Sequence, residues 1–159
     1  MKALRSKLPA LLIALSISAS LSFAAQGAAT IYPEVGRAQA DVAAALTDAT
    51  KTKRRVIIDF GGNWCTDCIV LDRYFHISEN AALLDKHYVL VHVNVGDKGI
   101  TDNFAIAKSC GIPLENGVPA LALLDPNGRV VFAQKHGEFE AMRKMDPASV
   151  NEFLRKWAK

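Results

Sequence analysis

Short hydrophobic segments recur along the chain, and their period indicates which element each one forms. Residues 55–60 and 88–95 are runs rich in Val and Ile, which predicts buried β-strands. The second run is apolar on both faces, as in a central strand of a parallel sheet. Residues 120–124 and 129–134 predict two more strands. The turn sequence Asp-Pro-Asn-Gly separates them, so they are expected to form an antiparallel hairpin.

Other segments have hydrophobic residues at helical spacing. The alanine-rich stretch 32–53 predicts an N-terminal helix. Residues 65–75 predict a second helix, and residues 76–87 continue it, after a break near Ser78, with one or two further helical turns.

Two further helices follow in the second half. Residues 101–110 predict a short helix that Thr101 or Asp102 caps and Gly111 ends. The tail, 146–159, predicts an amphipathic helix capped by Asp146. The predicted order is α-β-α-β-α-β-β-α, which describes one α/β domain with parallel strands first and an antiparallel hairpin last.

The first 29 residues have the pattern of a secretory signal peptide. A basic start is followed by the uncharged run 8–25, and small residues follow at 24–29. Cleavage would leave a mature domain of residues 30–159. An uncleaved membrane anchor is the alternative, because the apolar run approaches spanning length. The basic start consists of Lys2, Arg5 and Lys7.

Removing this segment also removes the net charge. All 16 acidic residues follow residue 30, whereas three of the 19 Lys and Arg residues precede residue 8. The mature chain therefore has as many basic as acidic residues, and no basic surface that would indicate a nucleic-acid partner. After cleavage we also expect no association with the membrane.

The segment Gly-Gly-Asn-Trp-Cys-Thr-Asp-Cys, 61–68, carries the candidate chemistry. Cys65 and Cys68 could be a structural disulfide, half of a metal site or a redox pair. A disulfide that closes so small a loop stabilises the folded protein little, which disfavours a structural disulfide. A metal site would need Cys110 or a histidine as further ligands, but the four histidines are scattered and no second Cys-x-x-Cys exists. We therefore expect no metal.

The local order of elements favours the redox pair. Cys65 follows a buried strand and opens a helix, where free N–H groups and the helix dipole stabilise a thiolate. Helical spacing brings Cys68 beside it, one turn inside. Cys65 would attack a partner disulfide, and Cys68 would resolve the mixed disulfide.

Two other positions bear on this pair. Asp59 ends the strand before the motif, where a buried carboxyl group could exchange a proton with Cys68. The alternative is an aspartate that only caps the following loop. Pro119 begins the strand 120–124, and a cis bond between Val118 and Pro119 would turn the chain toward the sulfurs.

The sequences 56–68 and 117–131 together resemble the thioredoxin superfamily, and the resemblance extends over residues 54–159 in order. It implies a thioredoxin fold with a central mixed sheet flanked by helices, here with an extra N-terminal helix. It also implies a thiol–disulfide oxidoreductase without a cofactor, acting on protein thiols and disulfides. In that family's arrangement Cys65 attacks, Cys68 resolves and Asp59 relays protons, while Trp64, Val118 and Pro119 shape the substrate groove.

The residues between the cysteines bear on the direction of electron flow. Strongly oxidising relatives have a histidine there, which stabilises the thiolate; Asp67 has the opposite charge and predicts a reducing couple. We therefore expect a periplasmic reductase, supplied with electrons by a membrane donor. A metal chaperone and a non-catalytic adaptor of the same fold remain the rival interpretations.

Three departures from the family pattern concern the surroundings of the site. Gly61 and Gly62 replace a bulkier pair, which predicts a looser approach to the cysteines. Residues 113–116 resemble an insertion, and residues 135–145 lengthen the link to the last helix. Either segment could border the substrate groove, but we interpret both as ordinary surface loops. Cys110, at the predicted end of a helix, is expected to be a buried and unreactive thiol, and the alternative is a regulatory or dimer-forming thiol.

Overall fold

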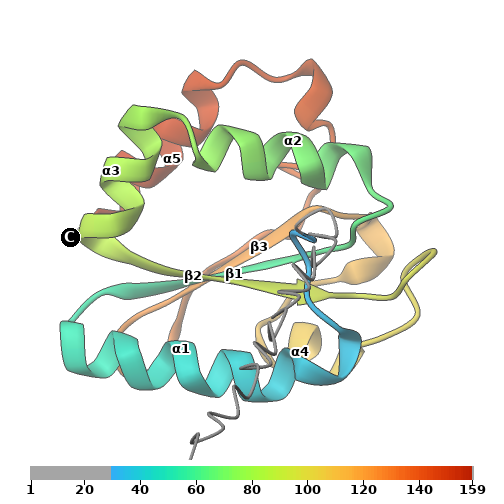
Figure 1. The fold of residues 1–159 in the computed structure, drawn as a ribbon, viewed down its shortest axis with the longest axis horizontal. Coiled ribbons are helices and arrows are strands. Elements are labelled where there is room, and N and C mark those ends of the chain that lie inside the picture. The colour runs from blue at the N-terminus through green and yellow to red at the C-terminus, as the bar shows by residue number, and fades with distance from the viewer. Residues whose placement is uncertain (1–29, 159) are drawn as a thin grey trace, which may run out of the picture.

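A four-stranded mixed sheet forms the centre of the molecule in a computed structural model that describes residues 30–158 (Figure 1). The predicted signal peptide, residues 1–29, lies outside the described residues. The strand order is β2-β1-β3-β4, with β1 and β2 parallel and the other neighbours antiparallel. The strands are β1 (Arg55–Gly61), β2 (Tyr88–Asn94), β3 (Ala120–Leu124) and β4 (Val130–Ala133).

Helices cover both faces of this sheet, as Figure 1 shows. Helices α1 and α4 lie on one face, and α2, α3 and α5 on the other. Three short 3-10 helices lie in the connections. The helices are α1 (Ala38–Thr52), α2 (Thr66–Phe75), α3 (Ser78–His87), α4 (Phe104–Ser109) and α5 (Ala148–Trp157), and the 3-10 helices are η1 (Val35–Arg37), η2 (Leu114–Asn116) and η3 (Met142–Lys144).

Strand β1 is the central element, with six of its seven residues buried. Its side chains alternate between two hydrophobic clusters, because successive residues of a strand point to opposite faces. Val56, Ile58 and Phe60 belong to the cluster that includes α1 and α4 residues, whereas Ile57 belongs to the cluster with α2 and α5. Asp59 follows Ile57 by two positions, so the two side chains point to the same face of the sheet. Its carboxylate is therefore directed to the face on which α2 carries Cys68.

The second half of the chain agrees with the sequence prediction. β3 and β4 form the predicted hairpin, and Gly128 adopts a left-handed φ of 82° in its turn. Pro147 is the N-cap residue of α5, and the Asp146 carboxylate one position earlier accepts a hydrogen bond from the N–H of Ala148, the first helical residue, at 2.8 Å.

Three predictions about elements were wrong in detail. β2 is an edge strand that pairs only with β1 among the described residues, although its sequence suggested a central position. Residues 76–87 contain α3, a full helix of 10 residues rather than one or two turns. Helix α4 starts at Phe104, without a side-chain cap from Thr101 or Asp102. The N–H groups of those two residues donate instead to the carbonyl oxygen of Val95, which closes a loop after β2.

The start of the chain also differs from the prediction. Tyr32 and Pro33 precede η1 and are not helical. The Tyr32 side chain is 1% exposed and packs with the two cysteines of the motif. The N-terminal segment therefore contributes to the site as well as to the helical layer.

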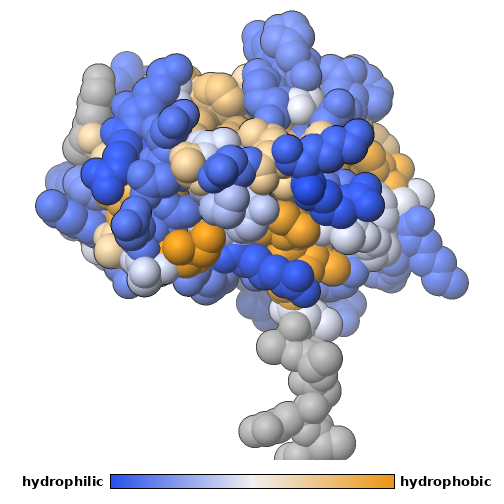
Figure 2. Space-filling model, turned by 90° about the horizontal axis from the view of Figure 1, so that it is seen from above, coloured by the Kyte–Doolittle hydropathy of each residue, from blue (hydrophilic) through white to orange (hydrophobic). Residues whose placement is uncertain are grey.

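Seen from the side of α2, α3 and α5, the surface is mainly hydrophilic with small separate hydrophobic areas (Figure 2). Between residues 30 and 158, no helix combines the length and the apolar character needed to cross a membrane.

Candidate active site

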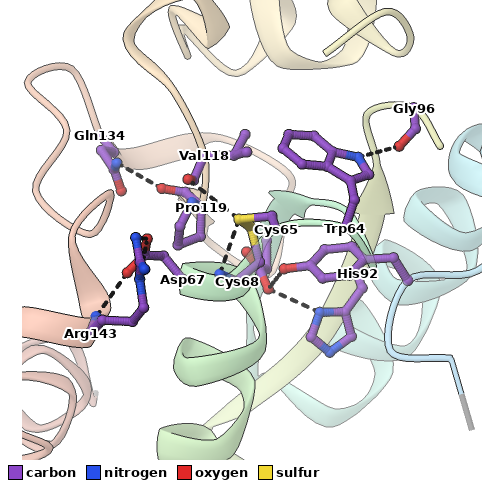
Figure 3. Close-up of a disulfide and its surroundings, with 12 residues drawn as sticks. Trp64, Cys65, Asp67, Cys68, His92, Gly96, Val118, Pro119, Gln134 and Arg143 are labelled. Atoms are coloured by element: carbon purple, nitrogen blue, oxygen red, sulfur yellow. Dashed lines mark hydrogen bonds and ion pairs between the residues drawn. A yellow bond between two sulfur atoms is a disulfide. The ribbon is translucent and has the colours of Figure 1, made fainter. Parts of the chain in front are cut away.

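Cys65 and Cys68 are bonded to each other at the N-terminus of α2 (Figure 3). Cys65 is the N-cap of this helix, and its sulfur accepts a hydrogen bond from the Cys68 N–H at 3.1 Å. Cys65 is 7% exposed, whereas Cys68 is fully buried. The sulfur nearer the surface therefore lies where a helix N-terminus stabilises negative charge, and the other is shielded one turn inside.

Trp64 forms one side of the approach to Cys65. Its ring nitrogen Nε1 donates to the Gly96 carbonyl at 2.6 Å, which fixes a side chain that is 39% exposed (Figure 3). A β-carbon at position 62 would lie 3.0 Å from two atoms of this indole ring, so glycine is needed for the ring to lie there.

The loop before β3 forms the opposite side. The Val118–Pro119 peptide bond is cis, and the Val118 carbonyl oxygen lies 3.6 Å from Cys65 Sγ. Gln134 holds this loop from behind, since its Nε2 donates to the Pro119 carbonyl at 3.0 Å and its Oε1 accepts from the Leu121 N–H at 3.2 Å. Cys65 therefore faces the backbone of a half-buried loop that enters β3.

Asp59 is fully buried beneath the motif, and its oxygen Oδ2 has two partners. The Tyr32 hydroxyl donates to Oδ2 at 2.7 Å, and His92 Nδ1 lies 3.0 Å from the same oxygen. The other oxygen, Oδ1, is buried with no hydrogen-bond partner among residues 30–158. Asp59 is thus not a loop cap, because its carboxylate is held by side chains from β2 and the N-terminal segment.

Gly61 lies directly beside this group. A β-carbon at position 61 would overlap the Tyr32 hydroxyl and lie 2.9 Å from Cys68 Sγ. The space that the missing side chain leaves at position 61 is thus filled by Tyr32. Tyr32 Oη and Cys68 Sγ border the same small volume next to Asp59.

The two partners of Asp59 differ in how they titrate. Burial and the charge of Asp59 raise the pKa of Tyr32 well above its ordinary value, so this hydroxyl stays protonated. Burial of the His92 ring disfavours its charged form and would lower its pKa. The hydrogen bond to Asp59 and the negative charges of Asp59 and Asp72 outweigh burial, so the pKa of His92 is raised. Tyr32 is a fixed donor, whereas His92 is a titratable ring whose charged form the two carboxylates favour.

Asp67, between the cysteines, is bound by Arg143 (Figure 3). The Arg143 backbone N–H donates to Asp67 Oδ1 at 2.8 Å, and its Nε donates to Oδ2 at 3.1 Å. Burial opposes ionisation of Asp67, but these hydrogen bonds and the Arg143 charge outweigh it and lower the pKa of Asp67. The carboxylate is therefore charged, with a cation in direct contact.

Arg143 belongs to the segment 135–145, which is not an ordinary surface loop. Phe139 and Met142 of this segment are 5% and 0% exposed and pack in the core beneath α2 and α5. Residues 113–116 are likewise anchored, since Leu114 is 1% exposed. Both segments lie at the surface as expected, but their buried side chains anchor them in the core. Segment 135–145 borders a cavity of about 330 Å³ beside the motif, lined also by Asp67, Gly117 and Val118.

The third cysteine is separate from this site. Cys110 is a free thiol, 6% exposed, at the C-terminal end of α4. Burial raises its pKa although Ser109 opposes the shift, which fits the predicted unreactive thiol. In the part of the chain that the structure describes, no three His, Cys, Asp or Glu side chains form a group that could hold a metal ion.

Comparisons with known proteins agree with this geometry. A family model described as thioredoxin-like matches residues 37–126, more than half of the chain. The chain belongs to the thioredoxin-like family. A crystal structure of a disulphide isomerase from Xylella fastidiosa Temecula1 is 31% identical, with a TM-score of 0.77, over 84% of this chain and 100% of the other.

A more distant member shares the fold alone. The solution structure of a thioredoxin from Thermus thermophilus is 20% identical, with a TM-score of 0.53, over 72% of this chain and 81% of the other. No curated protein matches the chain significantly. The predicted thioredoxin fold, with its mixed sheet, C-terminal hairpin and N-terminal helix, is confirmed.

The structure brings the six predicted site residues together around the disulfide. Sequence reasoning missed four other residues: three of them contact these six, and the fourth contacts Asp67 between the cysteines. Parallel pairing of the two predicted strands places His92 opposite Asp59, so the register could have revealed it. No local pattern marks the others, because each comes from a distant segment. The missed residues are Tyr32, His92, Gln134 and Arg143.

Proposed function

We propose that the protein exchanges dithiol and disulfide bonds with protein substrates, using Cys65 and Cys68. The observation that carries this proposal is the cysteine pair itself, bonded at a helix N-terminus with Cys65 facing the Val118 carbonyl. The similarity to a disulphide isomerase supports exchange with protein disulfides.

The exchange has two steps. In the reduced protein the Cys65 thiolate attacks a substrate disulfide, which forms a Cys65–substrate bond and releases one substrate thiolate. Cys68 then attacks Cys65, so that the Cys65–Cys68 bond forms and the second substrate thiolate leaves. Two electrons pass from the protein to the substrate, whose two sulfurs take protons from water.

Asp59 is proposed to be the base for the second step. Cys68 is fully buried, so water cannot readily remove its proton. Asp59 Oδ1 is buried, unpartnered and on the same side of the sheet, which leaves it free to accept that proton. Trp64, Val118 and Pro119 are proposed to hold the substrate, because they form the two sides of the approach to Cys65.

The proposed direction is reduction of the substrate. No histidine lies between the cysteines, and the carboxylate of Asp67 disfavours a neighbouring thiolate, so the reduced form gains little stabilisation. Arg143 compensates part of this charge, which makes the effect smaller than Asp67 alone would produce.

The proposed location is the periplasm, because residues 1–29 have the composition of a secretory signal. A reductase in an oxidising compartment needs a source of electrons, and a membrane donor is proposed to supply them.

Trapping tests this proposal. A Cys68→Ala variant, expressed with its signal, should accumulate mixed disulfides between Cys65 and periplasmic proteins, because the resolving thiol is absent. These adducts should vanish on reduction and be absent from a matched Cys65→Ala variant. Absence of adducts on Cys68→Ala, with the protein folded and exported, would contradict covalent exchange.

A further inference from the structure

We propose that His92 and Asp72 form the route by which Asp59 exchanges its proton with solvent. This inference rests on the proposed function, because it concerns the proton that Cys68 releases when it resolves a mixed disulfide.

Asp59 has no direct path to water. Its side chain is fully buried, so a proton accepted from Cys68 must leave through one of its two hydrogen-bond partners. Tyr32 is one partner, but its side chain is 1% exposed and its hydroxyl donates only to Asp59. The Tyr32 hydroxyl therefore ends the chain of hydrogen bonds on that side.

His92 leads in the other direction. It pairs with Asp59 across β1 and β2, and its ring stacks edge-to-face on Tyr32 with centroids 5.1 Å apart. Nδ1 lies 3.0 Å from Asp59 Oδ2, and Nε2 lies 3.6 Å from Asp72 Oδ1. An imidazole held between two carboxylates can accept a proton on one nitrogen and release another from the opposite nitrogen.

Asp72 connects this ring to the surface. Cys68, Asp72 and His76 are spaced by four residues along α2 and so lie on one stripe of the helix. The His92 and Asp72 side chains are each 17% exposed, and that of His76 is 68% exposed. His76 Nδ1 lies 3.5 Å from Asp72 Oδ1 and 2.7 Å from the Asp72 carbonyl oxygen. The side chains that face His92 are those of Tyr32, Asp59 and Asp72. Their solvent exposure increases only in the direction from Asp59 to Asp72.

The proton balance of the step follows from these contacts. Asp59 takes the Cys68 thiol proton as the Cys65–Cys68 bond forms and the bond from Cys65 to substrate breaks. Asp59 then gives a proton to Nδ1 of neutral His92, while Nε2 releases its proton toward Asp72 and water, so that the ring changes tautomer. The carboxylate is restored and one proton appears in solution. His92 touches neither sulfur in this account, so it is a positioning and proton-carrying residue rather than a catalytic one.

The test compares thiol release with proton release in a single turnover. Reduced protein is mixed with an aromatic disulfide whose thiolate is coloured, in weak buffer with a pH indicator, and all variants carry Cys110→Ala. Release of the second coloured thiolate reports resolution by Cys68, and the indicator reports the proton. In the wild-type background the proton should follow the second thiolate without delay.

In His92→Gln, which keeps a hydrogen-bond donor beside Asp59 but cannot carry a proton, proton release should lag roughly tenfold or more behind the thiolate. Asp72→Asn should show a shorter lag in the same direction. The distant His87→Gln should show no lag, which separates proton transfer by His92 from a general effect of losing a histidine.

Synchronous release in both His92→Gln and Asp72→Asn would overturn the inference. If His92→Gln fails to fold, Asp72→Asn decides alone. A wild-type protein that never releases the second thiolate would instead overturn the proposed function, so the two failures are distinguishable.

Discussion

At the scale of single residues, the reactivity of the cysteine pair depends on charges that come from outside the motif. Arg143 binds the carboxylate of Asp67, which lies between the two cysteines in the sequence. His92 binds the carboxylate of Asp59, which is buried beneath the disulfide. Neither contact is local in sequence, since Arg143 follows Asp67 by 76 positions. The same four-residue motif would therefore have different redox properties with another residue at 143.

Substitutions at this ion pair should move the redox potential in opposite directions. Asp67→Asn removes a negative charge beside Cys65 and leaves the Arg143 cation, so the thiolate is favoured and the potential should rise by roughly 15–30 mV. Arg143→Gln exposes the Asp67 charge and should lower the potential by a similar amount. Equilibration with glutathione, followed by counting alkylated thiols, measures both.

The double variant provides the control. If Arg143 acts through Asp67, its substitution should have a different effect in an Asp67→Asn background than in the wild type. Strictly additive shifts would show that the two side chains act on Cys65 independently.

His92 gives the folded protein a pH-dependent contribution to stability. Its pKa is raised because Asp59 and Asp72 outweigh the effect of burial, so the charged ring is more stable in the folded than in the unfolded state. This contribution is fully present below the ordinary pKa of about 6.5 and is lost as pH rises through the raised value.

The loss of unfolding free energy in His92→Gln should therefore be larger at about pH 6 than at about pH 9. Urea unfolding of the oxidised proteins at both pH values measures it, with His87→Gln as a matched control for loss of a histidine. An equal loss at both would be inconsistent with a charged His92 next to Asp59.

At the scale of elements, the sequence predicted those whose side chains have one clear period. The hairpin and α5 agree with the prediction because turn residues and an amphipathic face define them locally. The position of β2 at the edge could not be predicted in this way, since its apolar residues pack under helices on both faces and so resemble a central strand. Tyr32 was missed because its role depends on a contact with Asp59, 27 positions away.

The end of β1 shows how such a contact constrains an element. Gly61→Ala should be destabilising by about 1–3 kcal/mol, because the added methyl group overlaps the Tyr32 hydroxyl and crowds Cys68. Gly36→Ala is the matched control, since a β-carbon there meets no atom within 4 Å and should change stability little. Chemical unfolding measures both. Equal stability of the two variants would contradict the packing of Tyr32 against β1.

At the scale of the whole molecule, the sheet gathers residues from five separate segments around one disulfide. The cysteines, Asp59 and Pro119 could be predicted because each has a fixed place relative to a strand or helix end. The charges that tune them could not, since they depend on how segment 135–145 folds over α2 and how β1 and β2 align. The sequence thus indicated the chemistry of the cysteine pair, whereas tertiary packing determines which charged groups surround it.

The redox potential of the Cys65–Cys68 pair tests the central claim most directly. The purified mature domain should equilibrate reversibly with a thiol–disulfide buffer as a two-electron couple. Its potential should be nearer to the about −270 mV of thioredoxin than to the about −120 mV of the strongest oxidants of this fold. A pair that does not equilibrate would contradict thiol–disulfide exchange, and a potential near the upper value would contradict reduction as its direction.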